Sequence, residues 1–235
     1  MAEETASAAG GILGMFNAFV DPAGLAKAVK AKLFWLWPCI VFAAVFIVFG
    51  FLMMPYTFQL MDAKMAERGL PPEQLESAKN TMHKFTPIGV IATPIFIILI
   101  IMLCAWLVSA MGSVVGAAVK FRDSFSLMAA CSLLGCLQYI ATYVVIRVKG
   151  DEIVNQEQLA PAFGLDIFIP VHGVPLAILN FFSIFQIWSL VILGLALASL
   201  TGASKGKAFA AITPAWLIPL ILRVVGAAFQ GGSSS

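Results

Sequence analysis

Charged residues are scarce in this chain: they make up 11% of its 235 residues, whereas hydrophobic residues make up 61%. A soluble domain carries about 25% charged and about 45–50% apolar residues. This composition excludes a soluble globular protein, a disordered chain and a disulfide scaffold. The formal net charge of +2 is too small for the basic face that nucleic-acid binding needs. A membrane protein with several spans remains.

Acidic residues are absent from every long apolar stretch of the sequence. Carboxylates inside a membrane are expensive to keep and usually mark proton relays or ion paths. Their absence argues against a proton-coupled transporter, although a facilitator for a neutral substrate stays open. The four cysteines include no CxxC pair and all fall inside apolar stretches, where they act as small apolar residues.

The long apolar runs predict an all-α polytopic membrane protein, a bundle of five transmembrane helices with an interfacial N-terminal helix. A spanning helix needs about 20 apolar residues, and runs that do not alternate disfavour a barrel. The fifth run is interrupted by Pro214, Pro219 and Arg223, so four spans plus a re-entrant segment is the alternative. The expected division is an interfacial segment 1–32, a membrane domain 33–229 and a flexible tail 230–235. The expected spans are about 33–54, 88–111, 125–147, 176–200 and 208–229.

Two connections between the expected spans contain prolines. Pro71 and Pro72 divide the connection 55–87, which we expect to form two short helical pieces. Pro170 and Pro175 interrupt the helical pattern before the fourth span. We therefore expect 167–175 to be an apolar loop that dips into the membrane interface.

The N-terminal segment has the pattern of two short helices. Apolar residues recur at i, i+3, i+4 and i+7 from Ile12 to Phe19, and Asp21-Pro22 provides an N-cap and N1 residue for a second helix. An apolar stripe beside lysines suits a helix lying in the membrane surface, while packing on the bundle is equally open. The candidate membrane-surface residues are Phe16, Phe19, Lys27, Lys30 and Lys32.

Basic residues orient the chain only weakly. Seven lie on each side of the five expected spans, but the side that holds the N-terminus has shorter connections and a higher density of positive charge. We expect the N-terminus to be cytoplasmic and, because Glu3 and Glu4 replace a basic start, no secretory signal peptide. The basic residues on the expected inner side are Lys27, Lys30, Lys32, Lys120, Arg122, Lys205 and Lys207.

Small and neutral polar side chains are the candidate packing residues of the spans. Gly112 and Gly116 form a GxxxG pattern beside Ser109 and Ser113, which can seal the chain's own bundle or a dimer. Gln138 and Gln186 fall near mid-depth of neighbouring spans, and we expect them to hydrogen-bond with support from Asn180, Ser183 and Thr142. The alternative for Gln138, Gln186 and Asn180 is a polar substrate path.

No motif reaches the strength of a catalytic or metal site, and we expect no cofactor. Gly202-Ala203-Ser204-Lys205-Gly206 matches the nucleophile-elbow pattern, but it lies between two spans and both histidines fall on the other side. A tight basic turn is the preferred interpretation. His83 and His172 have no ligand spacing for a metal, so we interpret them as solvated or interfacial.

Four further stretches of the sequence are informative: 19–22 with 33–38, 121–127, 180–188 and 202–208. They resemble the Yip domain family of small multi-span membrane proteins, whose eukaryotic members interact with Ypt/Rab GTPases. The resemblance implies five spans, a cytosolic N-terminus and no known catalytic residues. The eukaryotic Asp-Leu-Tyr-Gly-Pro motif is not in this sequence, so Rab binding is not carried over, and the compact form is similar to the prokaryotic branch.

These observations together favour a non-enzymatic integral membrane protein that organises the bilayer or partner proteins in a trafficking or scaffold role. The expected partners are membrane lipids and other membrane proteins or further copies of the chain, with no nucleic acid. The resemblance to the prokaryotic branch places it in a bacterial cytoplasmic membrane. The alternative is a permease or an accessory subunit of a transporter.

Overall fold

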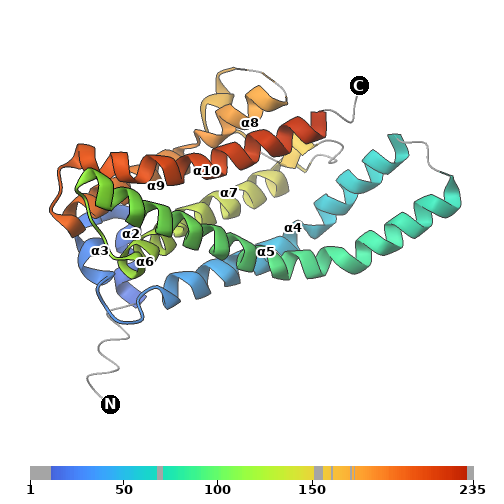
Figure 1. Cartoon of the computed structure of the whole chain (residues 1–235). Coiled ribbons are helices and arrows are strands. Elements are labelled where there is room, and N and C mark those ends of the chain that lie inside the picture. Colours follow the sequence, from blue (N-terminus) through green and yellow to red (C-terminus); the bar gives the residue numbers. More distant parts are fainter. Residues whose placement is uncertain are drawn as a thin grey trace, which may run out of the picture. The chain divides into compact units, whose positions relative to one another are not determined.

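The structure is a computed structural model that describes residues 12–67, 71–150, 156–159, 161–169, 171 and 173–231. The described residues form helices and no β-strand (Figure 1), which confirms the all-α prediction. Part of the expected tail, 232–235, lies outside the described residues. The elements are α2 (Asn17–Val20), α3 (Pro22–Ala28), α4 (Leu36–Glu67), α5 (Pro72–Val115), α6 (Phe121–Cys131), α7 (Leu133–Lys149), η1 (Gln156–Leu159), η2 (Leu165–Ile167), α8 (Val174–Phe181), α9 (Ile184–Thr201) and α10 (Lys205–Gly231).

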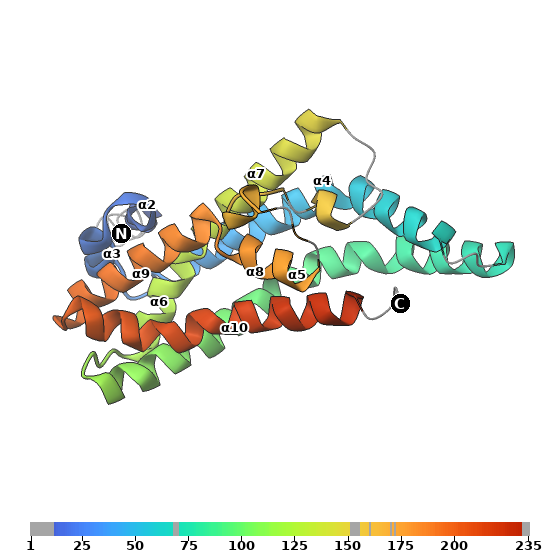
Figure 2. The ribbon, with the colours of Figure 1, turned by 90° about the horizontal axis from the view of Figure 1, so that it is seen from above.

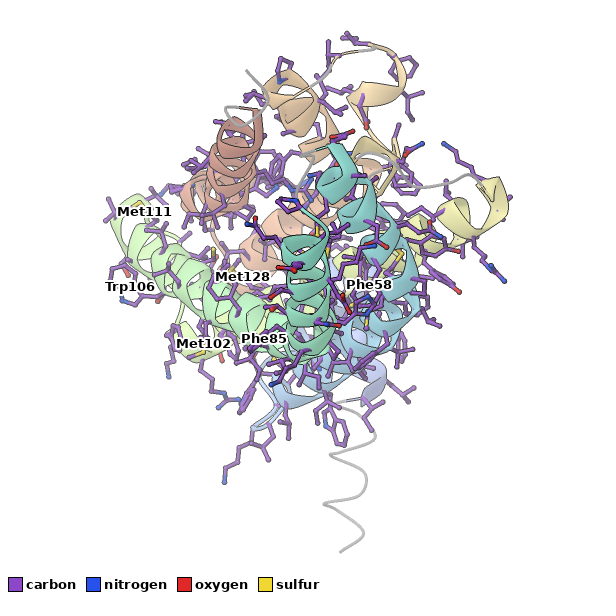
Figure 3. All side chains as sticks on the ribbon, turned by 90° about the vertical axis from the view of Figure 1, so that its right-hand side faces the viewer. Phe58, Phe85, Met102, Trp106, Met111 and Met128 are labelled. Atoms are coloured by element: carbon purple, nitrogen blue, oxygen red, sulfur yellow. The ribbon has the colours of Figure 1, made fainter. Side chains whose placement is uncertain are left out.

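Five helices are long and apolar enough to cross a membrane, as the sequence predicts. Within the most apolar 18 residues of each, only 17% to 39% of the residues are buried in the protein. Trp106, for example, projects outward from α5 (Figure 3) and is 59% exposed. So much exposed apolar surface fits a multi-pass membrane protein, whose outer side chains contact lipid tails. The five are Leu36–Glu67, Glu73–Val115, Phe121–Lys149, Ile184–Thr201 and Lys205–Ala228.

The first two spanning helices extend beyond the expected spans. α4 has 32 residues and α5 has 44, so the connection 55–87 continues both helices instead of forming separate short pieces. Pro72 stands at the start of α5, where its missing N–H costs nothing. Pro55, Pro87 and Pro94 lie inside these helices, where a spanning helix tolerates proline better than a soluble one.

The fourth span begins later than the sequence suggests, because the chain turns between α8 and α9. Phe182 leaves the helical conformation (φ −77°, ψ 45°) and Ser183 becomes the N-cap of α9. The Ser183 hydroxyl accepts a hydrogen bond from the Gln186 N–H at 3.3 Å. α9 then ends at Gly202, whose positive φ of 69° suits a glycine C-cap.

The chain divides into two compact units, and the first comprises Met1–Val41, Ile98–Gly135 and Ala162–Ser235. α9 is central to it: α3, α10, α6 and α2 all pack against α9 (Figure 2). Gly194 allows the close approach of α10, since a Cβ there would lie 2.5 Å from the Phe209 ring. Leu197 and Ile212 are fully buried in this unit.

The second unit comprises Phe42–Ile97 and Cys136–Pro161. Its buried cluster is Met53, Leu60 and Ile146. Two ring contacts join its helices: Phe46 stacks on Tyr139 with the ring centroids 4.7 Å apart, and Phe49 meets Tyr143 edge-on at 5.5 Å.

Candidate membrane interface

The N-terminal helices form as the sequence pattern indicates. The Asp21 carboxylate accepts a hydrogen bond from the Gly24 N–H at 2.9 Å, and Pro22 follows as the first helical residue of α3. This cap satisfies one of the N–H groups that a helix leaves unpaired at its start. α2 precedes this cap directly, since its last residue is Val20.

These helices pack on the bundle with one side and expose the other. Leu25 and Val29 are fully buried, and α3 makes its main contacts with α9. On the exposed side, Phe16 is 52% accessible and Lys27 is exposed, while Phe19 is half-buried. The segment therefore combines packing on the bundle with a free face that carries apolar and basic residues. The exposed large apolar residues of the N-terminal segment are Leu13, Phe16, Val20 and Leu33.

Arg122 ties the end of this segment to α6. One guanidinium nitrogen donates to the carbonyl oxygens of Lys30 at 2.9 Å and Ala31 at 2.7 Å. These carbonyls follow α3, near the partial negative charge of its C-terminal end, and the Ala31 carbonyl also accepts from the Phe34 N–H at 3.3 Å. Asp123 lies 4.0 Å from the same guanidinium. Arg122 thus holds together two segments that are about 90 residues apart in the sequence. The count of basic residues alone does not reveal this role.

Two further connections bring lysines to the same end of this unit. The α5–α6 connection and the start of α10 lie at this end (Figure 1). The first carries Lys120, and the second carries Lys205 and Lys207. The two connections meet, because a Cβ on Gly116 would lie 3.2 Å from the Lys207 ammonium nitrogen. We call this end, with its exposed residues Lys27, Lys30, Lys32, Lys120, Lys205 and Lys207, the basic end.

No ion pair engages the six lysines of the basic end within the described ranges of the chain. Lysines that are exposed, unpaired and beside apolar side chains suit the surface of an anionic bilayer leaflet. The geometry can therefore bind anionic headgroups.

The family model described as the Yip1 domain matches residues 16–226, which is most of the chain. The chain belongs to the Yip1 domain family. This confirms the resemblance of the four sequence stretches. Neither a curated protein nor a solved structure matches the chain significantly. The Yip1 family is generally non-enzymatic.

In this Yip1-domain protein the GxxxG residues shape the end of α5. The Ala117 N–H donates to the Gly112 carbonyl at 2.8 Å, and Gly116 has a φ of +77°. This is the geometry of a Schellman helix end. The Ser109 hydroxyl donates to the Val119 carbonyl at 2.6 Å, and the Ser113 hydroxyl donates to the Ser109 carbonyl at 3.0 Å. A role of these four residues between helices or between chains stays a prediction.

The candidate interhelical polar residues Gln138, Gln186 and Asn180 belong to three different helices. Gln138 is on α7 in the second unit, whereas Gln186 is on α9 in the first, so their pairing stays a prediction. Asn180 is buried at the end of α8 and has other partners. Its amide nitrogen donates to the Asp166 carboxylate at 2.9 Å, and its amide oxygen accepts from Arg223 at 3.1 Å.

The sequence patterns with weak catalytic or metal resemblance have structural roles. The Ser204 hydroxyl accepts from the Lys207 N–H at 3.5 Å and so caps α10. The His83 ring stacks on Phe58 with centroids 4.0 Å apart, and His172 lies outside the described residues. Over the described part of the chain, no three metal-ligating side chains come together.

Proposed function

We propose that this Yip1-domain protein is a non-enzymatic membrane organiser that gathers anionic lipids, and partner proteins bound to them, at its basic end. The observation that carries the proposal is the basic end itself, where six exposed lysines from three separate segments gather beside an apolar face. Such a surface supports a trafficking or scaffold role, because the surface would hold lipids and proteins in place.

The N-terminal helices present this charge in a fixed position. α3 packs on α9, and Arg122 binds the carbonyls just after α3. A surface that is ordered before binding loses little conformational entropy when it meets its partner. Each basic residue near an anionic leaflet contributes about 1 kcal/mol of attraction. Three lysines of the N-terminal segment therefore supply a substantial part of the expected attraction.

The same distribution supports a cytoplasmic N-terminus. Positive residues close to the ends of spans remain on the cytoplasmic side of a membrane. The basic end collects all the lysines that the sequence places on the inner side, and Arg122 stands with them. We place the protein in a bacterial cytoplasmic membrane in this orientation, as the resemblance to the compact prokaryotic branch implies.

A charge-removal experiment tests the proposal. The protein is extracted with mild detergent, and native mass spectrometry measures the ratio of anionic to zwitterionic lipid that stays bound. The variant Lys27→Gln, Lys30→Gln, Lys32→Gln should lower this ratio by about 100-fold, since three lysines at about 1 kcal/mol each contribute about 3 kcal/mol. The matched control removes the same charge from the side of the spans that the sequence topology assigns to the outside, with Lys64→Gln, Lys84→Gln and Lys149→Gln, and it should keep the ratio.

Two results would contradict the proposal. One is an equal ratio of bound lipids in the wild type and in the N-terminal lysine variant. The other is saturable solute flux by the reconstituted protein, which would make it a permease. Asn180, a residue that a polar path would need, is already bound to Asp166 and Arg223.

A further inference from the structure

A short turn far from the basic end in sequence exposes large apolar side chains. η2 and the two residues after it carry Leu165 (45% exposed), Ile167 (61%), Phe168 (78%) and Ile169 (49%). A cluster of this kind is unfavourable in water and marks a surface that meets a partner or a membrane. We call residues 165–169 the apolar turn.

The depth of the apolar turn follows from its attachment to α9. The Ile184 N–H, at the first residue of α9, donates to the Phe163 carbonyl at 2.9 Å. The Phe163 ring also meets the Phe185 ring edge-on, with centroids 5.7 Å apart. α9 has 18 residues and so is about 27 Å long, close to the hydrocarbon thickness of a bilayer. Its far end connects to the basic end, so its first residue lies at the opposite membrane boundary.

A second helix of the same unit gives the same depth. Arg223 stands 18 residues after Lys205 on α10, again about 27 Å along the helix. Its guanidinium donates to Asn180 and lies 5.8 Å from the centre of the Phe181 ring. An arginine at this depth extends toward the headgroups. α8, which packs on α10, therefore also lies at the boundary.

Asp166 is the one charged residue of the apolar turn, and its charge opposes contact with lipid. Both of its carboxylate oxygens, however, accept hydrogen bonds within the protein. One carboxylate oxygen accepts from the Gly164 N–H at 2.9 Å, and the other accepts from the Asn180 amide at 2.9 Å. Asn180 in turn accepts from Arg223. This Asp166–Asn180–Arg223 relay joins a negative and a positive group through a neutral amide. It leaves the four apolar side chains of the turn facing outward.

We propose that the apolar turn is a second membrane anchor, seated in the headgroup–acyl boundary of the leaflet opposite the basic end and held by the relay. The occupant is lipid because the turn lies at membrane depth beside exposed apolar residues of α9. Ile184 is 63% exposed and Ile187 is 45% exposed. The anchor is independent of the function proposed for the basic end. The expected interfacial loop 167–175 overlaps the apolar turn at 167–169 and stays a prediction for its other residues, of which 170 and 172 lie outside the described residues.

Spin-label depth measurement in proteoliposomes tests the anchor. Phe168→Cys is labelled in a Cys39→Ala background, because the other three cysteines are buried. The ratio of collisions with oxygen, which enters lipid, to collisions with a water-soluble nickel chelate reports depth. Val191→Cys, 42% exposed on α9, serves as the hydrocarbon reference. Glu76→Cys, exposed in the charged N-terminal turns of α5, serves as the aqueous reference.

The label at position 168 should give a ratio between the two references and clearly above that of Glu76→Cys. A ratio equal to the aqueous reference would overturn the anchor. Poor access to both reagents with an immobilised spectrum would also overturn it, because a second copy of the chain would then cover the turn.

The relay is tested with the same label. Asp166→Ala and Asn180→Ala should each shift the label at 168 toward the aqueous value and sharpen its spectrum, since the turn loses its tie to α8 and α10. Thr213→Ala is the matched control, because this exposed hydroxyl bonds only within α10, to the Phe209 carbonyl at 2.8 Å. An unchanged depth in both relay variants, with helical content intact, would overturn the role of the relay.

Discussion

Gly112 gives the sharpest test of how α5 ends. A methyl group added there would place its carbon 2.5 Å from the Ala117 carbonyl oxygen, where ordinary contact begins near 3.4 Å. The oxygen belongs to the backbone, so a side-chain rotation cannot relieve the overlap. Relief requires movement of the same peptide segment whose N–H donates to the Gly112 carbonyl at 2.8 Å.

The cost of Gly112→Ala follows from three effects. Overpacking costs about 1–3 kcal/mol, and the weakened hydrogen bond adds about 1 kcal/mol. The higher helix propensity of alanine returns about 1 kcal/mol. We therefore expect the free energy of unfolding to fall by about 2 kcal/mol. Gly89→Ala on the same helix is the matched control, because its added Cβ meets nothing within 4 Å and should be neutral or stabilising.

SDS titration in mixed micelles, followed by circular dichroism, measures the unfolding free energy, and light scattering gives the oligomeric state. The expected result is a less stable Gly112→Ala protein with an unchanged oligomeric state. If the variant keeps wild-type stability but changes from dimer to monomer, Gly112 contacts another chain and does not limit the approach of the Ala117 carbonyl at the end of α5.

Three further changes test individual contacts of the first unit. Asp21→Ala removes the hydrogen bond to the Gly24 N–H and should destabilise α3 by about 1 kcal/mol. Hydrogen exchange over 22–29 should then be faster, and unchanged exchange would contradict the role of Asp21 as a cap. Arg122→Gln should raise exchange over 29–34 but not within α9, and a uniform rise over the whole unit would show a global role instead. Ser124→Ala removes a buried hydroxyl that donates to the Ala105 carbonyl at 3.0 Å, and it should lower the unfolding free energy by about 1 kcal/mol in the SDS titration; no change would contradict this.

The number of spans and their approximate positions could be predicted because they depend on a bulk property, the length of apolar sequence. The cap of α3 at Asp21 and the turn at Gly202 could also be predicted, since both follow from local residue preferences. These features need no knowledge of distant neighbours. They are therefore the parts of the fold that a single sequence expresses most clearly.

The break between α8 and α9 could not be predicted in the same way. No proline or glycine stands between Asn180 and Ile184, and the apolar run continues through the break. Its position depends on the Phe163 carbonyl, which binds the first N–H of α9. Gly164 contributes as well, since a Cβ there would lie 2.6 Å from the Phe182 carbonyl oxygen. Such a tertiary contact overrides the local pattern.

The long-range hydrogen bonds of Arg122 and Asn180 could not be predicted from the sequence, because they also depend on tertiary packing. Arg122 binds carbonyls about 90 residues away, and Arg223 binds Asn180 across 43 residues. Sequence position indicated that Asn180 would take part in a contact between helices. It could not select Asp166 and Arg223 over Gln186, because that choice depends on how α8 folds back on α10.

The fixed ends of α9 have a consequence for where the protein can reside. Ser183 closes the helix at one end and Gly202 closes it at the other, so its length cannot adjust by adding a turn. A bilayer much thicker than about 27 Å would have to thin around this helix, at a cost of a fraction of a kcal/mol for each ångström of mismatch. A cell with membranes of several thicknesses would therefore concentrate this protein in the thinner ones.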